Sequence, residues 1–349
     1  MAQVTLNRLA VSIIFILIIS GCSSSAEKNS QVTSGATPSA TPIPPEPTSL
    51  EELTINSSPV AYWAWKKSSL KILNSTSTAK VAAVEVGPNS APDYLTPQVA
   101  IDLTSRLYSD HKQSQDLSYI YYEFEDTAWA QKKLNTFLGV NIQDWQKKQA
   151  QNLCRSKQDC FGAAAITHSE KPAGIVLITA SANGKKDVNH TSGTLEAHEY
   201  AHIIQDELQG RYLGQVPRWQ SEGEAMFAQA AAIHYLDFSA YNLERQRIIR
   251  GLVGNREISE NWLIDFISPA SGLTDWQAWD KYDSWRVYDV GMLVTEVLAS
   301  LKGPEAPMSL SFEVGKGLSY EKSFEKIFGI SWKSAVPMIA KIIHNQINS

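Results

Sequence analysis

Residues 194–210, TLEAHEYAHIIQDELQG, combine two histidines and a glutamate with regularly spaced apolar residues. On a helix that turns about 100° per residue, His198 and His202 lie one above the other, and Glu199 lies about 100° from His198. Apolar residues at positions 197, 201, 204 and 208 lie on the opposite side, where they can face a core. Gly210 follows as a helix stop. The stretch predicts an amphipathic helix over 194–209 that presents two imidazoles and a carboxylate on one side.

The spacing of His198 and His202 is typical of a metal site built on one helix. Residues at i and i+4 are neighbours on a helix surface, so the two imidazoles can bind one zinc ion. Glu199 lies close enough to act as a base on water at that ion. Asp206 lies on the same side, and we expect it either to orient a ligand histidine or to be a solvated carboxylate.

A zinc site needs a third protein ligand, and residues 217–225 offer a candidate. Pro217 suits the first turn of a helix, and apolar residues recur at heptad spacing from Trp219 onward. Glu222 lies close to this inward stripe, where a carboxylate needs a cation, whereas Glu224 points away and fits an exposed face. We therefore expect Glu222 to be the third ligand.

These two segments resemble the signature of a known family. His-Glu-x-x-His, followed about twenty residues later by Trp-x-x-Glu-Gly, is typical of gluzincin zinc metallopeptidases, and this chain is most similar to the peptidase MA-like group. The resemblance spans roughly residues 162–336. It implies that His198, His202 and Glu222 bind one zinc ion and that Glu199 is the general base. It also implies a zincin-like, two-lobed fold.

A later helix resembles the one that carries a catalytic tyrosine in the related membrane-alanyl aminopeptidases. Their tyrosine opens a Tyr-x-x-Gly helix, and here Tyr288-Asp289-Val290-Gly291 begins at a similar distance after Glu222. By resemblance, Tyr288 would stabilise the oxyanion; Tyr282 is a rival, and an ordinary buried tyrosine is the alternative. Four tryptophans before it could line a cleft or pack in the core: Trp262, Trp276, Trp279 and Trp285.

One departure from the aminopeptidases concerns recognition of the substrate's free amine. Their Gly-x-Met-Glu-Asn motif, in the strand region before the metal helix, supplies a glutamate for this purpose. The strand predicted at Gly174–Thr179 contains no acidic residue. We therefore expect endopeptidase rather than aminopeptidase action.

The remaining pattern predicts an α+β fold in two lobes. Strands are expected at 80–86, 117–124, 161–167 and 174–179, the last two as a hairpin, with helices at 96–108 and 128–138. Helices predominate after residue 191, near 194–209, 218–236, 240–251, 286–301, 320–327 and 332–346. We expect an N-terminal α/β lobe over 53–214 with a small, mostly antiparallel sheet, and a C-terminal helical lobe over 215–349 that carries Glu222.

The bulk composition is that of a globular protein and argues against a nucleic-acid partner. The chain has 349 residues, of which 43% are hydrophobic and 19% are charged. Its formal net charge of −5 gives no basic footprint for nucleic acid. The mild acidity identifies no other partner.

The N-terminus predicts export and membrane attachment. Arg8 precedes the apolar run 9–19, and Ile19-Ser20-Gly21-Cys22 resembles the bacterial lipoprotein cleavage box. We expect a signal peptide over 1–21, lipidation of Cys22, and a disordered Ser/Thr/Pro tether over 22–52 that holds the folded part off the membrane. A plain secretory signal or an uncleaved anchor is the alternative.

The two remaining cysteines lie on either side of a short polar loop. Export would allow a disulfide between Cys154 and Cys160. Such a bond would staple the loop and have no catalytic role; two free thiols are the alternative.

Together these features predict a membrane-anchored, extracytoplasmic zinc peptidase that acts on a peptide or protein. Zinc would activate water, with Glu199 as the general base. The alternative is a surface lipoprotein that binds a partner or a cell-wall component and has a structural or catalytically silent zinc site. A second alternative is a binding protein without metal, in which the motif is coincidental.

Overall fold

The folded part of the chain begins at Pro44, and Pro44–Ser349 form one compact unit. The computed structural model describes residues 43–114, 116–139, 146–168, 171–180, 188–254, 257–269 and 285–349. The predicted signal peptide, Cys22 and most of the predicted tether lie outside these residues. Within the described ranges, no helix has both the length and the apolar character needed to cross a bilayer.

The tether predicted through residue 52 is wrong at its C-terminal end. Helix α1 (Leu50–Ile55) begins there, and the Ser49 hydroxyl caps its first turn. The two leucines of α1 are buried, and Trp63 Nε1 donates a hydrogen bond to the carbonyl oxygen of Pro44. Buried leucines at helical spacing outweigh the Pro-rich composition that precedes them.

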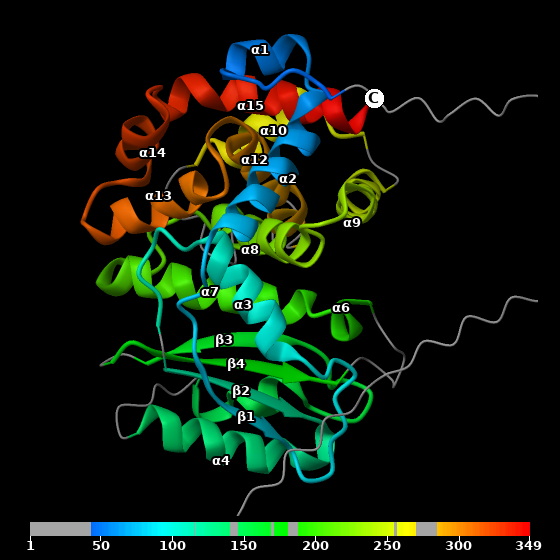
Figure 1. Cartoon of the computed structure of the whole chain (residues 1–349), viewed down its shortest axis with the longest axis vertical. Helices are drawn as coiled ribbons and strands as arrows, with labels where there is room; N and C mark the ends of the chain where they lie inside the picture. Colours follow the sequence, from blue (N-terminus) through cyan, green and yellow to red (C-terminus); the bar gives the residue numbers. More distant parts are fainter. Residues whose placement is uncertain are drawn as a thin grey trace, which may run out of the picture. The chain divides into compact units, whose positions relative to one another are not determined.

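A four-stranded sheet forms one side of the unit (Figure 1). Its strands are β1 (Val81–Val86), β2 (Asp116–Tyr122), β3 (Ala163–Thr167) and β4 (Ala173–Thr179), in the spatial order β1-β2-β4-β3. The pairs β1–β2 and β2–β4 are parallel, and only β3–β4 is antiparallel, as a hairpin. The prediction of a mostly antiparallel sheet is therefore wrong.

The parallel pairs follow from the helices between the strands. Parallel neighbours need a crossover, which α3 (Pro97–Leu107) provides between β1 and β2. Between β2 and β4 the chain passes through α4 (Thr127–Leu138) before it reaches the hairpin. Both helices were predicted from the sequence. Their alternation with the predicted strands already indicated a parallel sheet.

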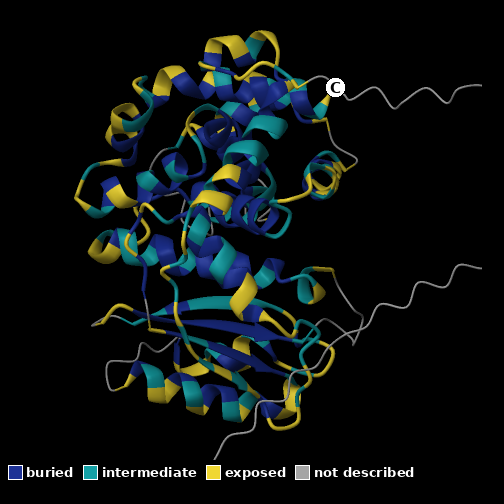
Figure 2. Ribbon diagram, in the orientation of Figure 1, coloured by how far each residue is buried: buried dark blue, intermediate teal, exposed yellow. Residues whose placement is uncertain are grey.

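Helices cover both faces of the sheet. Along β2, Tyr119 and Tyr121 pack in the core beneath α3 and α7, whereas Ile120 and Tyr122 pack in the core against α4. Figure 1 shows α4 on the opposite side of the sheet from α3 and α7. Every residue of β4 is buried, as the dark strands in Figure 2 show. A strand covered on both faces has a continuous apolar sequence, which explains Gly174–Thr179.

The rest of the unit is helical, which confirms the predicted α+β class. The helices are α2 (Pro59–Asn74), α5 (Gln149–Leu153), α6 (Val188–Thr191), α7 (Thr194–Gln209), α8 (Arg218–Ile233), α9 (Phe238–Val253), α10 (Glu260–Ile267), α12 (Arg286–Lys302), α13 (Glu305–Gly315), α14 (Tyr320–Phe328) and α15 (Trp332–Ile347), with 3-10 turns at Phe124–Asp126, Gln146–Lys148 and Gly210–Tyr212. All six helices predicted after residue 191 are present, whereas the described helices α1, α2, α5, α6, α10 and α13 were not predicted.

Helix α12 lies at the centre of the helical part and packs on α2, α8, α13 and α15. Helix α2 comes from residues that the sequence assigns to the N-terminal lobe, yet it packs along α12. Val60 of α2 belongs to the core around α12, and Ala64, one turn later, belongs to the core beneath α7. This single helix therefore joins the helical part to the part that contains the sheet.

Helices α8 and α12 cross with their backbones in contact because a glycine faces a glycine. A Cβ atom on Gly223 would lie 1.9 Å from the carbonyl carbon of Gly291, and one on Gly291 would lie 1.8 Å from the carbonyl oxygen of Trp219. No side chain fits in this space. The crossing brings Glu222, next to Gly223, towards Tyr288, which lies one turn before Gly291. The glycines of both sequence motifs thus allow this close packing.

Candidate metal centre

Helix α7 carries the two histidines on the side that faces away from its apolar residues. Gly193 and Gly210, with φ values of 86° and 52°, stand at its two ends in backbone conformations that favour glycine. Its apolar side, including Ile203 and Ile204, is fully buried. The opposite side therefore turns His198 and His202 towards α8.

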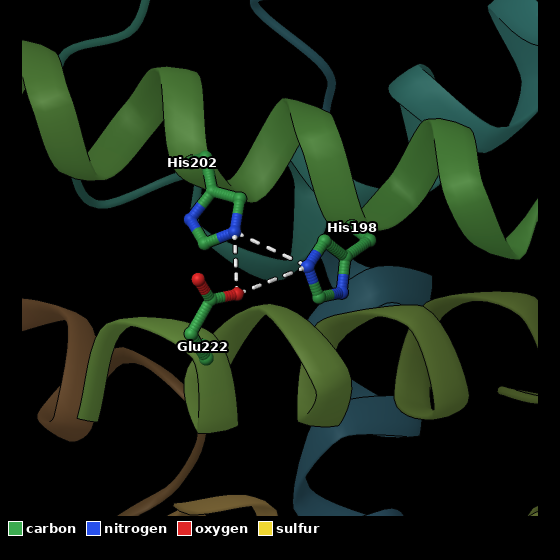
Figure 3. A group of neighbouring side chains, drawn as sticks. All are labelled: His198, His202 and Glu222. Atoms are coloured by element: carbon green, nitrogen blue, oxygen red, sulfur yellow. Dashed lines mark hydrogen bonds and ion pairs between the residues drawn. The ribbon is translucent and has the colours of Figure 1, made fainter. Parts of the chain in front are cut away.

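The side chains of His198, His202 and Glu222 converge between α7 and α8 (Figure 3). Nε2 of His202 lies 3.1 Å from Nε2 of His198 and 3.2 Å from Oε2 of Glu222. The third separation, from His198 Nε2 to Glu222 Oε2, is 3.5 Å. In the part of the chain that the structure describes, this is the one group of His, Cys, Asp or Glu side chains whose ligand atoms lie close enough to hold a metal ion.

The triangle of ligand atoms has the size that a tetrahedral transition-metal ion requires. Ligand atoms about 2.0–2.1 Å from a tetrahedral centre lie roughly 3.3–3.4 Å apart. The three separations, 3.1, 3.2 and 3.5 Å, lie close to this value. Two imidazole nitrogens and one carboxylate oxygen suit zinc and similar ions better than calcium or magnesium, which prefer oxygen ligands.

The charges in the cluster favour a bound cation. Burial lowers the pKa of His202, but the neighbouring Glu222 carboxylate outweighs this effect and raises the pKa to about 10. Burial raises the pKa of Glu222, while His202 and His198 hold it far below its usual range. The Glu222 carboxylate is therefore ionised at neutral pH and attracts positive charge to the space between the three side chains.

Arg218 holds the second oxygen of Glu222. Its Nη2 atom lies 3.4 Å from Glu222 Oε1, which leaves Oε2 facing the imidazoles. A hydrogen bond also joins Arg218 to Tyr288. The sequence interpretation missed Arg218, although its position one helical turn before Glu222 was a signal that the two side chains are neighbours.

Gln205, rather than Asp206, contacts the second ring nitrogen of His202. Gln205 Oε1 lies 2.8 Å from His202 Nδ1. Gln205 Nε2 donates to the carbonyl oxygen of Ser221 at 3.0 Å and to Glu224 Oε2 at 2.9 Å. The residue at i+3 therefore makes the contact that was one of the two alternatives expected for Asp206 at i+4.

Two acidic residues differ from the sequence expectation. Asp206 accepts a hydrogen bond from Thr167 Oγ1 of β3 at 3.2 Å, because its side of α7 faces that strand. Glu224 is 0% exposed and does not lie on an exposed face, because neighbouring helices cover α8 on almost every side. A helical wheel of α8 alone could not reveal these neighbours.

Glu199 lies beside the cluster and is held by β3. Its carboxylate accepts a hydrogen bond from the backbone N–H of Ala165. Burial raises the pKa of Glu199, and the positive charge of His198 and His202 partly offsets this effect. A buried carboxylate with a raised pKa is suited to accept a proton during catalysis.

A cleft of about 580 Å³ opens beside these residues. His198, Glu199 and Tyr288 line it, and the Tyr288 ring stacks on the His198 ring with 6.1 Å between centroids. Burial raises the pKa of the Tyr288 hydroxyl, which therefore stays protonated and can donate a hydrogen bond. Apolar side chains form much of the remaining lining: Phe161, Leu195, Met226, Ile248 and Trp285.

The predicted tryptophan cluster and the rival tyrosine are only partly visible. Trp285 is 65% exposed and lies at the cleft beside Tyr288. Trp262 instead stacks on Phe266, with 5.1 Å between ring centroids, and packs against the helical core. The other three aromatic residues lie outside the described residues: Trp276, Trp279 and Tyr282.

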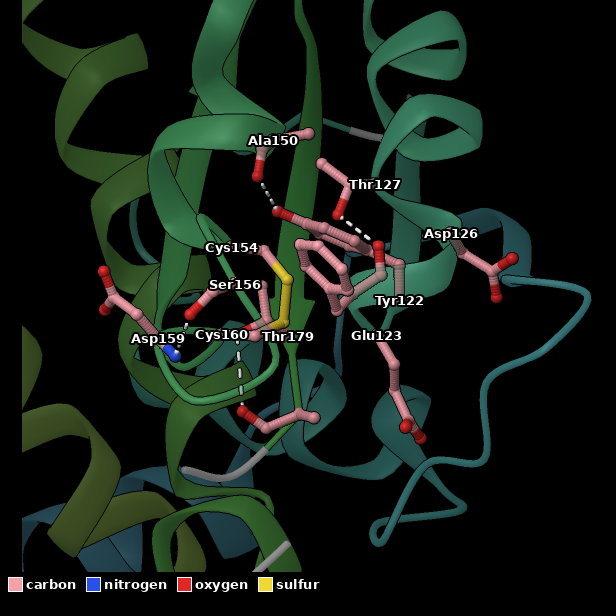
Figure 4. The surroundings of a disulfide bond; sticks show 12 residues. Tyr122, Glu123, Asp126, Thr127, Ala150, Cys154, Ser156, Asp159, Cys160 and Thr179 are labelled. Atoms are coloured by element: carbon pink, nitrogen blue, oxygen red, sulfur yellow. Dashed lines mark hydrogen bonds between the residues drawn. A yellow bond between two sulfur atoms is a disulfide. The ribbon is translucent and has the colours of Figure 1, made fainter. Parts of the chain in front are cut away.

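Cys154 and Cys160 form a disulfide (Figure 4). Both cysteines belong to the core between the sheet and α4, on the face opposite α7. The bond closes the polar loop 155–159 and lies on the far side of the sheet from the histidines. Its position therefore fits a structural staple.

No protein-family model, curated protein or solved structure matches this chain. Conclusions about function therefore rest on the residues themselves and on their arrangement.

Proposed function

We propose that this protein is a zinc-dependent peptidase with a zincin-like, two-lobed fold. The observation that carries the proposal is the convergence of His198, His202 and Glu222 on one point. Glu199 and Tyr288 line the cleft beside that point, where a general base and an oxyanion donor are needed.

The chain provides the groups for hydrolysis of an amide. When bound, a zinc ion with three protein ligands lowers the pKa of water at its open position to about 7 and polarises a carbonyl group. Glu199 takes a proton from the attacking water at its carboxylate and passes it to the nitrogen of the leaving amine. The Tyr288 hydroxyl, held by Arg218, donates a hydrogen bond to the oxyanion that develops on the carbonyl.

The outer edge of β3 supports an extended peptide as the substrate. β3 is the last strand of the sheet, and the carbonyl of Gly162 bonds inward to β4 through Thr179 N–H. Backbone groups alternate along a strand, so those of Ala163 and Ala165 point away from β4. Ala163 lines the cleft, and Ala165 bonds Glu199. The outward backbone groups of this edge that are not bonded within the chain can pair with another extended chain.

The same strand supports endopeptidase action. Gly174–Thr179, where the sequence shows no acidic residue, is the inner strand β4, and both its faces are covered. The strand that borders the site is β3, which also lacks an acidic residue. Asp289 lies in the cleft but pairs with Arg286 at 3.3 Å. Among the described residues that line the cleft, we therefore assign no carboxylate to binding the free amine of a substrate.

We also propose that a lipid on Cys22 anchors the peptidase to a bacterial membrane outside the cytoplasm. Support comes from the export pattern in residues 1–22 and from the disulfide, which oxidising compartments permit. A peptide or protein substrate would then meet the enzyme at the cell surface or in the envelope.

The proposal is tested with full-length protein and its Glu199→Gln variant. We expect the wild-type protein to contain one zinc per chain and to digest casein, with loss of activity in a chelator and recovery on adding zinc. Glu199→Gln should keep the zinc and lose activity by about 10²–10⁴-fold, because the carboxylate can no longer accept a proton. Elemental analysis and mass spectrometry of the peptides measure both results.

Glu207→Gln is the matched control, since Glu207 lies about 180° around α7 from His198. This variant should retain both zinc and activity. A wild-type protein that binds zinc yet cleaves no casein or library peptide would contradict the peptidase. Normal activity in Glu199→Gln would contradict the role of Glu199.

A further inference from the structure

We propose that Gln205, supported by Glu224 and the Ser221 carbonyl, sets the ring orientation and tautomer of His202 and thereby the metal affinity of the cluster. This inference rests on the proposed zinc site. It assigns a positioning role to two buried residues that bind no metal themselves.

The three residues link the two helices that supply the ligands. Gln205 lies three residues after His202 on α7 and is 1% exposed. Ser221 and Glu224 lie on either side of Glu222 on α8, and both accept hydrogen bonds from the same amide nitrogen of Gln205. One side chain therefore contacts a ligand on α7 and two neighbours of the ligand on α8.

The Ser221 carbonyl fixes which way the amide of Gln205 points. A carbonyl oxygen only accepts hydrogen bonds, so the Gln205 atom that lies 3.0 Å from it must be the nitrogen. The amide oxygen then faces His202 Nδ1 at 2.8 Å. Because that oxygen cannot donate, Nδ1 must carry the hydrogen. This conclusion holds for either protonation state of Glu224.

A hydrogen on Nδ1 is the arrangement that a metal ligand at Nε2 requires. A neutral imidazole carries one hydrogen, so once His202 is neutral Nε2 is the atom that can bind a metal ion in the space shared with His198 and Glu222. The bond from Gln205 also fixes the rotation of the ring. Metal binding then costs less reorganisation, and loss of such a contact typically lowers metal affinity about 10–100-fold.

Glu224 explains how Gln205 is held in place. Its Oε2 accepts from the second amide hydrogen of Gln205 at 2.9 Å. Its side chain is 0% exposed, and in the described part of the chain its Oε1 has no hydrogen-bond partner. Burying a carboxylate is costly, so this position needs a compensating role. The hydrogen bond to Glu224 orients Gln205, and through it the bond to His202.

The first experiment compares full-length wild-type protein with Gln205→Ala and with the control Gln209→Ala. Gln209 lies one turn further along α7 and is 3% exposed, but neither ligand histidine hydrogen-bonds to it in the described part of the chain. Zinc affinity is measured by competition with a chromophoric chelator, and Co²⁺ replaces zinc to report ligand geometry by visible absorption. We expect Gln205→Ala to weaken zinc about 10–100-fold and to change the Co²⁺ spectrum. Gln209→Ala should leave both unchanged.

A charge swap distinguishes positioning from packing. In Gln205→Glu, two carboxylates face each other, and we expect zinc affinity to fall. Adding Glu224→Gln to that variant supplies an amide donor to the new carboxylate, which still accepts from His202 Nδ1–H. The double variant should recover part of the lost affinity and of the wild-type Co²⁺ spectrum, because the Ser221 carbonyl still faces a carboxylate oxygen. A residue that only fills space would show no such rescue.

The outcomes separate this inference from the proposed function. Wild-type affinity and spectrum in Gln205→Ala would overturn the positioning role while the peptidase stands. Zinc binding that depends on Gln205, without hydrolysis of any peptide, would support the positioning role and contradict the peptidase. A wild-type protein that binds neither Zn²⁺ nor Co²⁺ would overturn both.

Discussion

Two buried clusters of charged side chains differ in the source of their positive charge. In the first, the carboxylate of Glu296 on α12 is 0% exposed and meets Arg245 of α9, with 2.7 Å between Nε and Oε2. Tyr241 donates to its other oxygen at 2.7 Å. We call Glu296, Arg245 and Tyr241 the closed cluster, because the Arg245 guanidinium balances the charge of the Glu296 carboxylate.

We call the second cluster, formed by His198, His202 and Glu222, the open cluster. Two imidazole nitrogens and one carboxylate oxygen face one another, and Arg218 Nη2 lies 3.4 Å from the outer oxygen of Glu222. Burial lowers the pKa of His202, but Glu222 outweighs burial and raises it to about 10, so among the described residues a proton on His202 balances Glu222 until a metal ion replaces it. The comparison shows that burial and charge alone do not mark a functional site. Three ligand atoms that lie close enough to hold one metal ion distinguish the second cluster from the first.

The largest expected effect is on the closed cluster. Arg245→Met leaves Glu296 buried without its partner, and we expect the free energy of unfolding to fall by about 3–5 kcal/mol. Urea unfolding measures the loss, which should be the same with and without a chelator because no metal is involved. A loss that vanishes in the chelator would contradict the division into closed and open clusters.

Two tyrosines, one beside each cluster, should distinguish an effect on stability from an effect on activity when each is replaced. Tyr288→Phe should lower kcat by about 10²–10³-fold, because one oxyanion donor is lost, and should leave zinc content unchanged. Tyr241→Phe is the matched control: it should cost about 1.5–3 kcal/mol of stability, because the hydrogen bond goes to a charged group, and leave kcat intact. Peptide hydrolysis and urea unfolding test the pair. The opposite pattern would overturn the assignment.

Metal removal should affect only the open cluster. With free zinc at about 100 times its dissociation constant, binding stabilises the folded state by about 2.7 kcal/mol. A chelator should remove this stabilisation from the wild-type protein but have little effect on Glu222→Ala, which lacks a ligand. Thermal unfolding with and without the chelator measures the difference. An equal response in both proteins would contradict the assignment of Glu222.

The smallest expected effect comes from the disulfide, which touches neither cluster. Cys154→Ser combined with Cys160→Ser should cost about 2 kcal/mol of stability, because the bond closes a short loop. Zinc affinity should not change, because the loop lies on the opposite face of the sheet from the histidines. A marked fall in affinity would show that the loop contributes to the metal site.

Local patterns allowed much of this structure to be predicted. The helix at 194–209 and the position of Glu222 on α8 follow from periodicity within a few turns. The hydrogen bonds from Gln205 to Ser221 and Glu224 and the burial of Glu224 depend on which helices pack together, and no single-helix pattern contains that information. Strand order also could not be predicted from local patterns, because it is set by pairing between segments that are distant in the sequence. Helix α2 was missed because its aromatic and serine residues show no clear apolar stripe.

The glycine contact between α8 and α12 has a mechanical consequence. At that point no rotamer can adjust the distance between the helices, since main chain touches main chain at Gly223 and Gly291. Substitutions elsewhere in the helical core can repack without altering this spacing. If the cleft widens to admit a long polypeptide, α8 and α12 should stay together as one body, and the movement should arise in the segments around them.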